Sequence, residues 1–267
     1  DGQLWYNSTA TNFKFQYGAT AAAWSTGGNL NNDKKNSAAA GIQTAALVFG
    51  GQSPQVKTES YNGTSWTEEN DLNTGRHYFG GAGTQTAALG FGGYGTVSPN
   101  ITAITETWNG TSWTEVNDMN TERGRLNGTG ATNTAALAIG GYPAPLSALV
   151  ETWNGTSWTA VNTLGTARYS GAAAGTNTAA LMTGGIAAPT NALTELYNGT
   201  SWTEVADLNT GRGYIGGCGT QTAAIVFGSN SPPKALTETW NGTTWTETSD
   251  MINGREGMAG AGTTAAA

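Results

Sequence analysis

A six-residue motif, an aromatic residue followed by Asn-Gly-Thr-Ser/Thr-Trp, occurs five times in this chain of 267 residues. Its closing tryptophans are Trp66, Trp113, Trp158, Trp202 and Trp245, and Trp24 ends a degenerate sixth copy. The steps between successive tryptophans are 42, 47, 45, 44 and 43 residues. A period in this range is typical of repeat architectures in which each repeat is one supersecondary unit. The chain therefore folds as an array of similar units.

Each repeat predicts four short β-strands, which we call a, b, c and d. In one repeat, the Gly/Ala-rich run at 80–83 is strand a, and Ala-Ala-Leu-Gly-Phe at 87–91 is strand b. Strands c and d are the runs at 104–108 and 113–116, which are rich in Thr, Trp and β-branched residues that favour strands. Asn-Gly between c and d is a strong hairpin signal, because both residues tolerate positive φ. The small residues of a and b suit the crowded inner part of a radial array, and Trp and Tyr suit its outer part.

These features resemble the kelch repeat of β-propellers. The resemblance rests on a Gly-Gly pair that ends one strand, an aromatic residue that ends the next, then a Trp and a downstream Arg. One repeat carries them as Gly50-Gly51, Tyr61, Trp66 and Arg76. The aromatic-to-Trp spacing is tight for a kelch repeat, and Gly228-Ser229 replaces one Gly-Gly pair. The resemblance covers nearly the whole chain and implies an all-β, kelch-like propeller.

The number of blades follows from counting strands. Strands a and b occur at 36–51, 77–93, 124–141, 169–185 and 213–229, each followed by c and d. Residues 256–267 look like strand a with the beginning of b, and Phe13 to Tyr17 and Trp24 look like c and d. We predict six four-stranded blades, the last closed by strands from both termini, because closure pairs exposed strand edges. The alternative is five blades plus an N-terminal arm. Residues 1–12 form an N-terminal hairpin or linker, and 13–267 the propeller.

Composition excludes several functions. A net charge of −7 argues against nucleic acid, whose binders carry a basic face. No apolar stretch approaches the roughly 20 residues that span a bilayer, so we expect no membrane insertion. The single Cys218 excludes an intrachain disulfide, and we expect it to be a small buried residue. His77 is the only histidine, too few for a copper site. We therefore predict no metal, no cofactor and no catalytic residue, with repeated acids such as Glu115 at solvated blade edges.

One face of the propeller is the predicted binding face. Strands alternate in direction, so the b–c and d–a loops share a face, and all seven prolines fall in its variable b–c loops. Such loops on a regular scaffold are where binding sites concentrate. Tyrosine stacks on sugar rings and arginine donates hydrogen bonds, so we predict a ligand site around the central channel. Its candidates are Tyr78, Tyr94, Tyr142, Tyr169, Tyr214, Arg76, Arg168 and Arg212.

The repeated arginines have a second interpretation, in which they hold the fold together. A position that is kept in every repeat is more often structural, since one ligand rarely needs the same group six times. In this interpretation each Arg ties adjacent blades together by pairing with a repeated glutamate. The glutamates are Glu59, Glu106, Glu151, Glu195 and Glu238.

The first residues add a second resemblance. Leu4-Trp5-Tyr6-Asn7-Ser8-Thr9, followed by Phe13-Lys14-Phe15, resembles a short hairpin of bacteriophage tail-fibre and related virion proteins. The resemblance implies a non-enzymatic structural or binding module, in a virion or at an extracellular surface, that contacts a host glycan or another virion subunit. A homo-oligomer would fit such a fibre. The chain begins with Asp rather than Met, so we expect a piece of a longer protein.

Two other functions stay open from the sequence. One is a polysaccharide-degrading enzyme with non-repeated acids such as Glu122 or Glu256 on the variable face, because a carboxylate pair suffices for glycoside hydrolysis. The other is a kelch-type protein-interaction scaffold.

Overall fold

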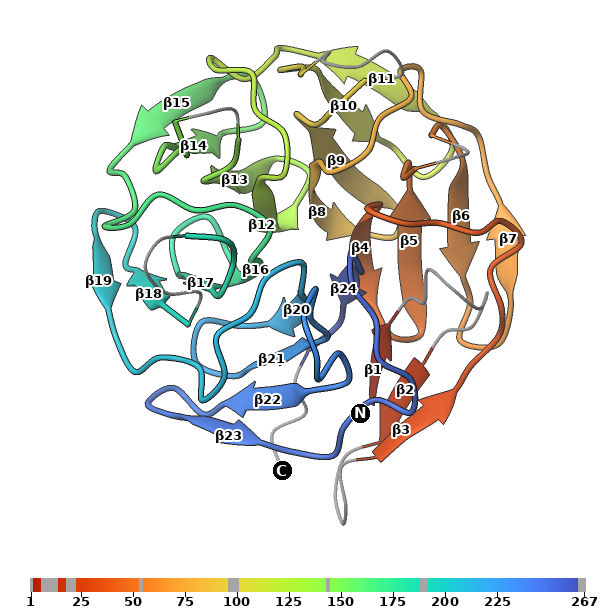
Figure 1. Cartoon of the computed structure of the whole chain (residues 1–267). Helices are drawn as coiled ribbons and strands as arrows, with labels where there is room; N and C mark the ends of the chain where they lie inside the picture. Colours follow the sequence, from red (N-terminus) through yellow and green to blue (C-terminus); the bar gives the residue numbers. More distant parts are fainter. Residues whose placement is uncertain are drawn as a thin grey trace.

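The computed structural model of the chain describes residues 2–5, 14–17, 23–52, 55–95, 101–142, 145–187 and 192–263. All regular elements in these ranges are β-strands, and none is a helix. The strands form four-stranded antiparallel sheets arranged around a central axis, which is a β-propeller (Figure 1). The prediction of an all-β propeller is therefore confirmed.

Five blades each consist of four consecutive strands. Blade 1 contains β4 (Ala38–Ile42), β5 (Ala45–Phe49), β6 (Thr58–Tyr61) and β7 (Trp66–Glu68). Blade 2 contains β8 (Gly80–Thr84), β9 (Ala87–Phe91), β10 (Thr105–Trp108) and β11 (Trp113–Val116). Blade 3 contains β12 (Asn127–Thr132), β13 (Ala135–Ile139), β14 (Val150–Trp153) and β15 (Trp158–Val161). Blade 4 contains β16 (Ala172–Gly175), β17 (Ala180–Thr183), β18 (Thr194–Tyr197) and β19 (Trp202–Glu204). Blade 5 contains β20 (Gly216–Gly219), β21 (Ala224–Phe227), β22 (Thr237–Trp240) and β23 (Trp245–Glu247).

A further four-stranded sheet, the terminal sheet, joins the two ends of the chain. Its order is β24 (Gly260–Ala261), β1 (Gly2–Trp5), β2 (Lys14–Tyr17) and β3 (Ala23–Thr26). The structure thus has the five complete blades of the alternative prediction, together with a sheet made from both termini. The second strand of this sheet differs from the prediction. It is β1, whereas we expected it to be formed by the residues that follow β24 in the chain. β1 belongs to the segment 1–12, and it pairs with both β24 and β2.

The first strand of every sheet lies nearest the axis. The strands β4, β8, β12, β16, β20 and β24 follow one another around the centre, and β24 contacts both β20 and β4 (Figure 1). Their small residues are needed for this close approach, as predicted. A Cβ added at Gly128 of β12 would lie only 2.6 Å from the backbone nitrogen and oxygen of Gly81 in β8. A larger residue there would force the inner strands apart.

The hydrophobic core lies between adjacent blades. One cluster joins Leu47 and Phe49 of blade 1 to Phe79, Trp108 and Trp113 of blade 2. The tryptophan of strand d also bonds to the preceding blade: Nε1 of Trp113 donates to the Thr58 hydroxyl at 3.0 Å. Strand b is buried along almost its whole length, because it is covered by a blade on each side. This explains why strand b is a continuous apolar run.

The Asn-Gly turns differ in detail from the prediction. The glycine has positive φ, as at Gly110 with 92°, but the asparagine does not. The Asn109 side-chain oxygen instead accepts from the backbone N–H groups of Thr111 and Ser112, both at 2.9 Å. Trp108 pairs with Trp113, so the loop between the two strands has four residues. A loop of this length does not need the two positive φ angles of a two-residue hairpin turn.

Candidate functional site

The mouth of the central channel is encircled by a closed ring of backbone hydrogen bonds. Its members, which we call the channel ring, are Asn36, Tyr78, Arg125, Ser170, Tyr214 and Gly257. Each N–H donates to the carbonyl oxygen of the previous member, over distances of 2.7 to 2.9 Å, and Asn36 donates to Gly257. All six residues have positive φ, between 53° and 64°. The ring thus carries five residue types at six positions that share one backbone geometry.

Arg125 is surrounded by tyrosine rings at this mouth. Its guanidinium carbon lies 4.9 Å from the ring centre of Tyr78, 5.5 Å from Tyr169, 5.7 Å from Tyr214 and 5.9 Å from Tyr142. We call these four residues the tyrosine cluster. The face of an aromatic ring attracts a cation that lies within about 6 Å of the ring centre. The cluster therefore holds one positive charge in a fixed position at the channel mouth.

All five predicted tyrosines lie at this mouth. Tyr78 and Tyr214 belong to the channel ring, and their rings are 6.1 Å apart. Tyr169 lies between Tyr142 and Tyr214, at 5.8 and 6.3 Å. Tyr94 contacts Tyr78 and pairs by its backbone with His77. The structure thus brings together side chains that are up to 136 positions apart in the sequence, the separation of Tyr78 and Tyr214.

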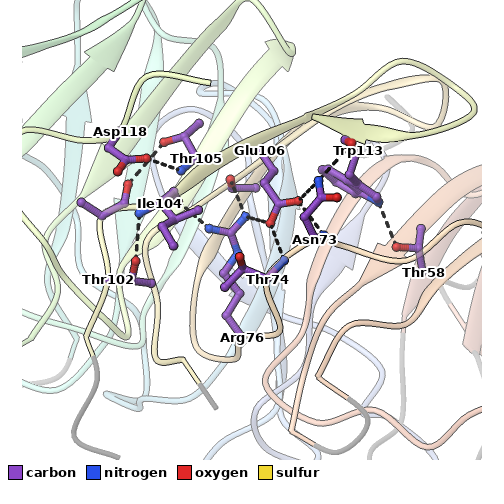
Figure 2. Close-up of polar contacts among 12 residues, drawn as sticks. Thr58, Asn73, Thr74, Arg76, Thr102, Ile104, Thr105, Glu106, Trp113 and Asp118 are labelled. Atoms are coloured by element: carbon purple, nitrogen blue, oxygen red, sulfur yellow. Dashed lines mark hydrogen bonds and ion pairs between the residues drawn. The ribbon is translucent and has the colours of Figure 1, made fainter. Parts of the chain in front are cut away.

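The predicted arginines lie elsewhere, inside the blades. Arg76 is fully buried and pairs with Glu106 at 3.0 Å, and its guanidinium also donates to the carbonyl oxygen of Ile104 (Figure 2). It donates to the carbonyl oxygen of Gly90 as well. Glu106 further accepts from Asn73 and Thr74, which lie in the loop from blade 1 (Figure 2). Burial lowers the pKa of Arg76 to about 10, and Glu106 opposes this shift, so Arg76 stays charged at neutral pH.

A pair of a buried basic residue and a buried glutamate occurs in each of the other four complete blades as well. Arg123 pairs with Glu151 at 2.8 Å, Arg168 with Glu195 at 2.6 Å, Arg212 with Glu238, and Lys34 with Glu59 at 3.7 Å. All of these side chains are buried. The pairing of the repeated arginines with the repeated glutamates is as the second interpretation predicts. In this arrangement Arg76, Arg168 and Arg212 do not face solvent.

Sequence reasoning missed Arg125, because it follows the repeated Arg123 and looked like one more scattered charge. A signal was present in the alignment of the repeats. The position two residues after the repeated basic residue is Asn36, Tyr78, Arg125, Ser170, Tyr214 or Gly257. No residue type dominates there, although all six positions have the same positive-φ backbone geometry. Variation at one fixed place on a repeated backbone marks a position that is free to serve a ligand.

A cavity of about 120 Å³ lies in the channel below the channel ring. Small residues of the inner strands line it, together with Ser37, Asn127 and Arg125. Arg125 is the only charged residue in the described lining. A second cavity of about 120 Å³ continues further along the channel, between the glycines and alanines of the inner strands.

The remaining charges near the mouth form one small network. Glu256 pairs with Lys234 at 2.9 Å and with Lys35 at 3.5 Å. Burial acts to raise the pKa of Glu256, but Lys234 and Lys35 outweigh it and hold the pKa below its ordinary value. A general acid for glycoside hydrolysis needs a raised pKa. Glu256 is therefore poorly suited to that role, and Glu122 is exposed on the surface.

Three titratable neighbours of Arg125 have shifted pKa values, and none of the three is negatively charged at neutral pH. Burial, and then the charge of Arg125, lower the pKa of His77. Burial raises the pKa of Tyr94 and of Tyr214. Burial also raises the pKa of the Cys218 thiol in blade 5, which is buried as predicted.

No group of His, Cys, Asp and Glu side chains that could hold a metal ion occurs in the ranges the structure describes. Within these ranges no helix is long and apolar enough to cross a membrane. A scan of the chain against protein-family models and a search of the curated proteins give no match. The candidate site therefore stands on the geometry of the channel mouth.

Proposed function

We propose that this chain is a non-enzymatic binding module that takes a glycan at the channel mouth, on the face formed by the b–c and d–a loops. The observation that carries the proposal is Arg125 held among four tyrosine rings at the channel mouth. Aromatic faces stack on sugar rings, and a planar guanidinium donates several hydrogen bonds. Because the packed rings already fix the guanidinium, little conformational entropy is lost when a ligand binds.

The setting we propose is a virion or another extracellular surface, with the ligand on a host cell. The Thr/Asn/Gly/Ala-rich kelch-like repeats and the N-terminal run from Leu4 to Phe15 support this setting. Another virion subunit is the second candidate partner. The pKa of Glu256, which the flanking lysines lower, supports binding without hydrolysis.

A glycan array tests the proposal. The wild-type protein is compared with a Tyr142→Ala/Tyr169→Ala variant, which removes two aromatic faces and leaves the channel ring intact. The matched control is Thr111→Ala/Thr156→Ala, which changes two exposed residues in the Asn-Gly turns of the opposite face. Loss of stacking on each ring is expected to weaken binding by roughly 1 kcal/mol, so the double variant should bind about tenfold or more weakly.

The control variant should bind like the wild type. Equal binding by all three proteins, or no binding to any glycan, would contradict the proposal. A reducing-sugar assay on the bound glycans separates binding from catalysis. Sugar release that is lost in Glu256→Gln or Glu122→Gln would show an enzyme instead.

A further inference from the structure

The charge at the channel mouth is opposite in sign to that of the chain. The chain has a net charge of −7, yet among the described residues the mouth holds three cations, Arg125, Lys35 and Lys234, against the single acid Glu256, a local sum of +2. Five other basic side chains that point into the blades, such as Arg76, are paired with buried glutamates, whereas Arg255 is buried without an acidic partner among the described residues. Arg125 makes no ion pair with any residue that the structure describes.

The donors of Arg125 are mostly unused. Nη1 donates to the hydroxyl of Tyr214 at 2.7 Å. Nε is buried and has no hydrogen-bond partner among the described residues. Nη2 likewise makes no hydrogen bond within these ranges, while the side chain as a whole is only half-buried. A guanidinium with free donors and no acidic neighbour is arranged to receive an anion, and its planar fork matches a carboxylate.

The two halves of the channel ring carry different side chains. Tyr78 and Tyr214 lie opposite each other in the ring, and their rings contact across the axis. On one side of this pair stand Arg125 and Ser170. On the other side stand Gly257, which has no side chain, and Asn36. The Asn36 side chain lies against Gly257, since a Cβ added at Gly257 would lie only 2.2 Å from Oδ1 of Asn36.

The cavity behind the ring is polar. Asn36 and Ser37 line it, both more than nine-tenths buried. The side-chain oxygens Oδ1 of Asn36 and Oγ of Ser37 have no hydrogen-bond partner among the described residues. Buried polar atoms normally have a partner. A ligand hydroxyl group that enters the cavity would supply one.

We infer that the ligand of this mouth is an acidic glycan, whose carboxylate binds the guanidinium of Arg125 and whose hydroxyl groups reach Asn36 and Ser37. This inference rests on the proposed function and names the chemical class of its ligand. A neutral sugar would leave the Arg125 charge uncompensated in a half-buried site. A carboxylate adds a charge-assisted hydrogen bond, and this favours an acidic sugar over its neutral counterpart by about tenfold or more.

Two sugars that differ at one group provide the probe: methyl glucuronide, with a carboxylate at carbon 6, and methyl glucoside, with a hydroxymethyl group there. Their affinities are measured by NMR titration against the wild type, Arg125→Asn and Arg125→Lys. Asparagine tolerates the positive φ at this position, so the ring backbone is kept. Lys57→Gln is the matched control, because it removes one surface cation that pairs with Glu68 and Asp71, outside the mouth.

The wild type and Lys57→Gln should prefer the glucuronide by about tenfold or more. Arg125→Asn should lose the preference, and Arg125→Lys should keep part of it, since lysine retains the charge but not the planar fork. Equal affinities for the two sugars in the wild type, or a preference that survives Arg125→Asn, would overturn the inference. If array binding still fell in the Tyr142→Ala/Tyr169→Ala variant, the proposed function would stand with a neutral ligand. Binding to no glycan at all would overturn both.

Discussion

Nη1 of Arg125 lies 2.7 Å from the hydroxyl oxygen of Tyr214, a hydrogen bond between two members of the channel ring that are 89 residues apart in the sequence. It fixes how the guanidinium lies among the tyrosine rings. The Arg125 charge is thus held in place by one directed bond and by four aromatic contacts.

Removing only this hydroxyl should weaken ligand binding. Tyr214→Phe keeps the aromatic ring but leaves Nη1 without its acceptor, so only the aromatic contacts hold the guanidinium. We expect affinity for the array-positive glycans to fall several-fold, in line with about 1 kcal/mol for one hydrogen bond. Tyr142→Phe is the control, because the Tyr142 hydroxyl makes no hydrogen bond within the described residues. Isothermal titration of both variants checks this, and equal losses would count against the role of the bond.

The repeated basic residues should differ in their effect on stability. Arg76→Met leaves Glu106 buried without its cation, which is expected to cost about 3–5 kcal/mol. Arg255 is equally buried, at 2% exposure, but none of its guanidinium nitrogens has a partner in the described part of the chain. Arg255→Met should therefore be neutral or stabilising, since it removes an uncompensated buried charge. Urea unfolding measures both variants, and similar losses in the two would contradict this account.

Lys34 makes the stability depend on pH in the alkaline range. Burial lowers its pKa from 10.5 to about 8, although Glu59 opposes the shift. Between these pH values the folded protein has lost a proton that the unfolded chain keeps, so this group raises the free energy of unfolding as pH rises. The Lys34→Arg variant carries the residue that the other repeats have at this position, and its guanidinium does not titrate in this pH range.

The variant should be more stable than the wild type at pH 7, and its advantage should shrink between about pH 8 and pH 10.5. Denaturant unfolding of both proteins at several pH values measures the difference. An advantage that stays constant or grows with pH would show that Lys34 is not the titrating group.

The interface between blades 3 and 4 lacks one hydrogen bond. Nε1 of Trp158 donates to the Thr105 hydroxyl at 3.0 Å, and most interfaces have the equivalent bond. At the same place in blade 3 stands Val150, and Nε1 of Trp202 is buried without a partner among the described residues. Val150→Thr should supply the acceptor and stabilise the protein by about 1 kcal/mol.

The matched variant, Thr105→Val, removes the equivalent hydroxyl from an interface that has it. Thr105→Val takes the acceptor from Trp158 and should destabilise the protein by about 1–3 kcal/mol, because it leaves a buried donor unsatisfied. Thermal unfolding of the two variants gives the comparison. A Val150→Thr variant less stable than the wild type would mean that the hydroxyl finds no partner there.

Much of the fold follows from the sequence because the repeat fixes it. The motif that ends in Trp113 places strands c and d, and the apolar run of β9 marks a strand covered on both faces. The role of β1 was not predictable in this way. The run Gly2–Trp5 shares no repeat signature, and its place depends on pairing with β24 at the other end of the chain.

The candidate site was predictable only in part. The tyrosines were found because each follows a repeated Arg or a Gly-Gly pair. Arg125 was not, because its role depends on a positive φ and on rings from three other blades, which a local pattern does not reveal. The repeated arginines that seemed available to a ligand are buried against glutamates instead.

The most direct test of the account is a crystal structure of the protein in complex with a glucuronic-acid oligosaccharide. The account predicts the sugar at the channel mouth, with its carboxylate on the guanidinium of Arg125 and a sugar ring against the tyrosine cluster. A sugar bound on the opposite face, over the Asn-Gly turns, with Arg125 uncovered, would contradict it.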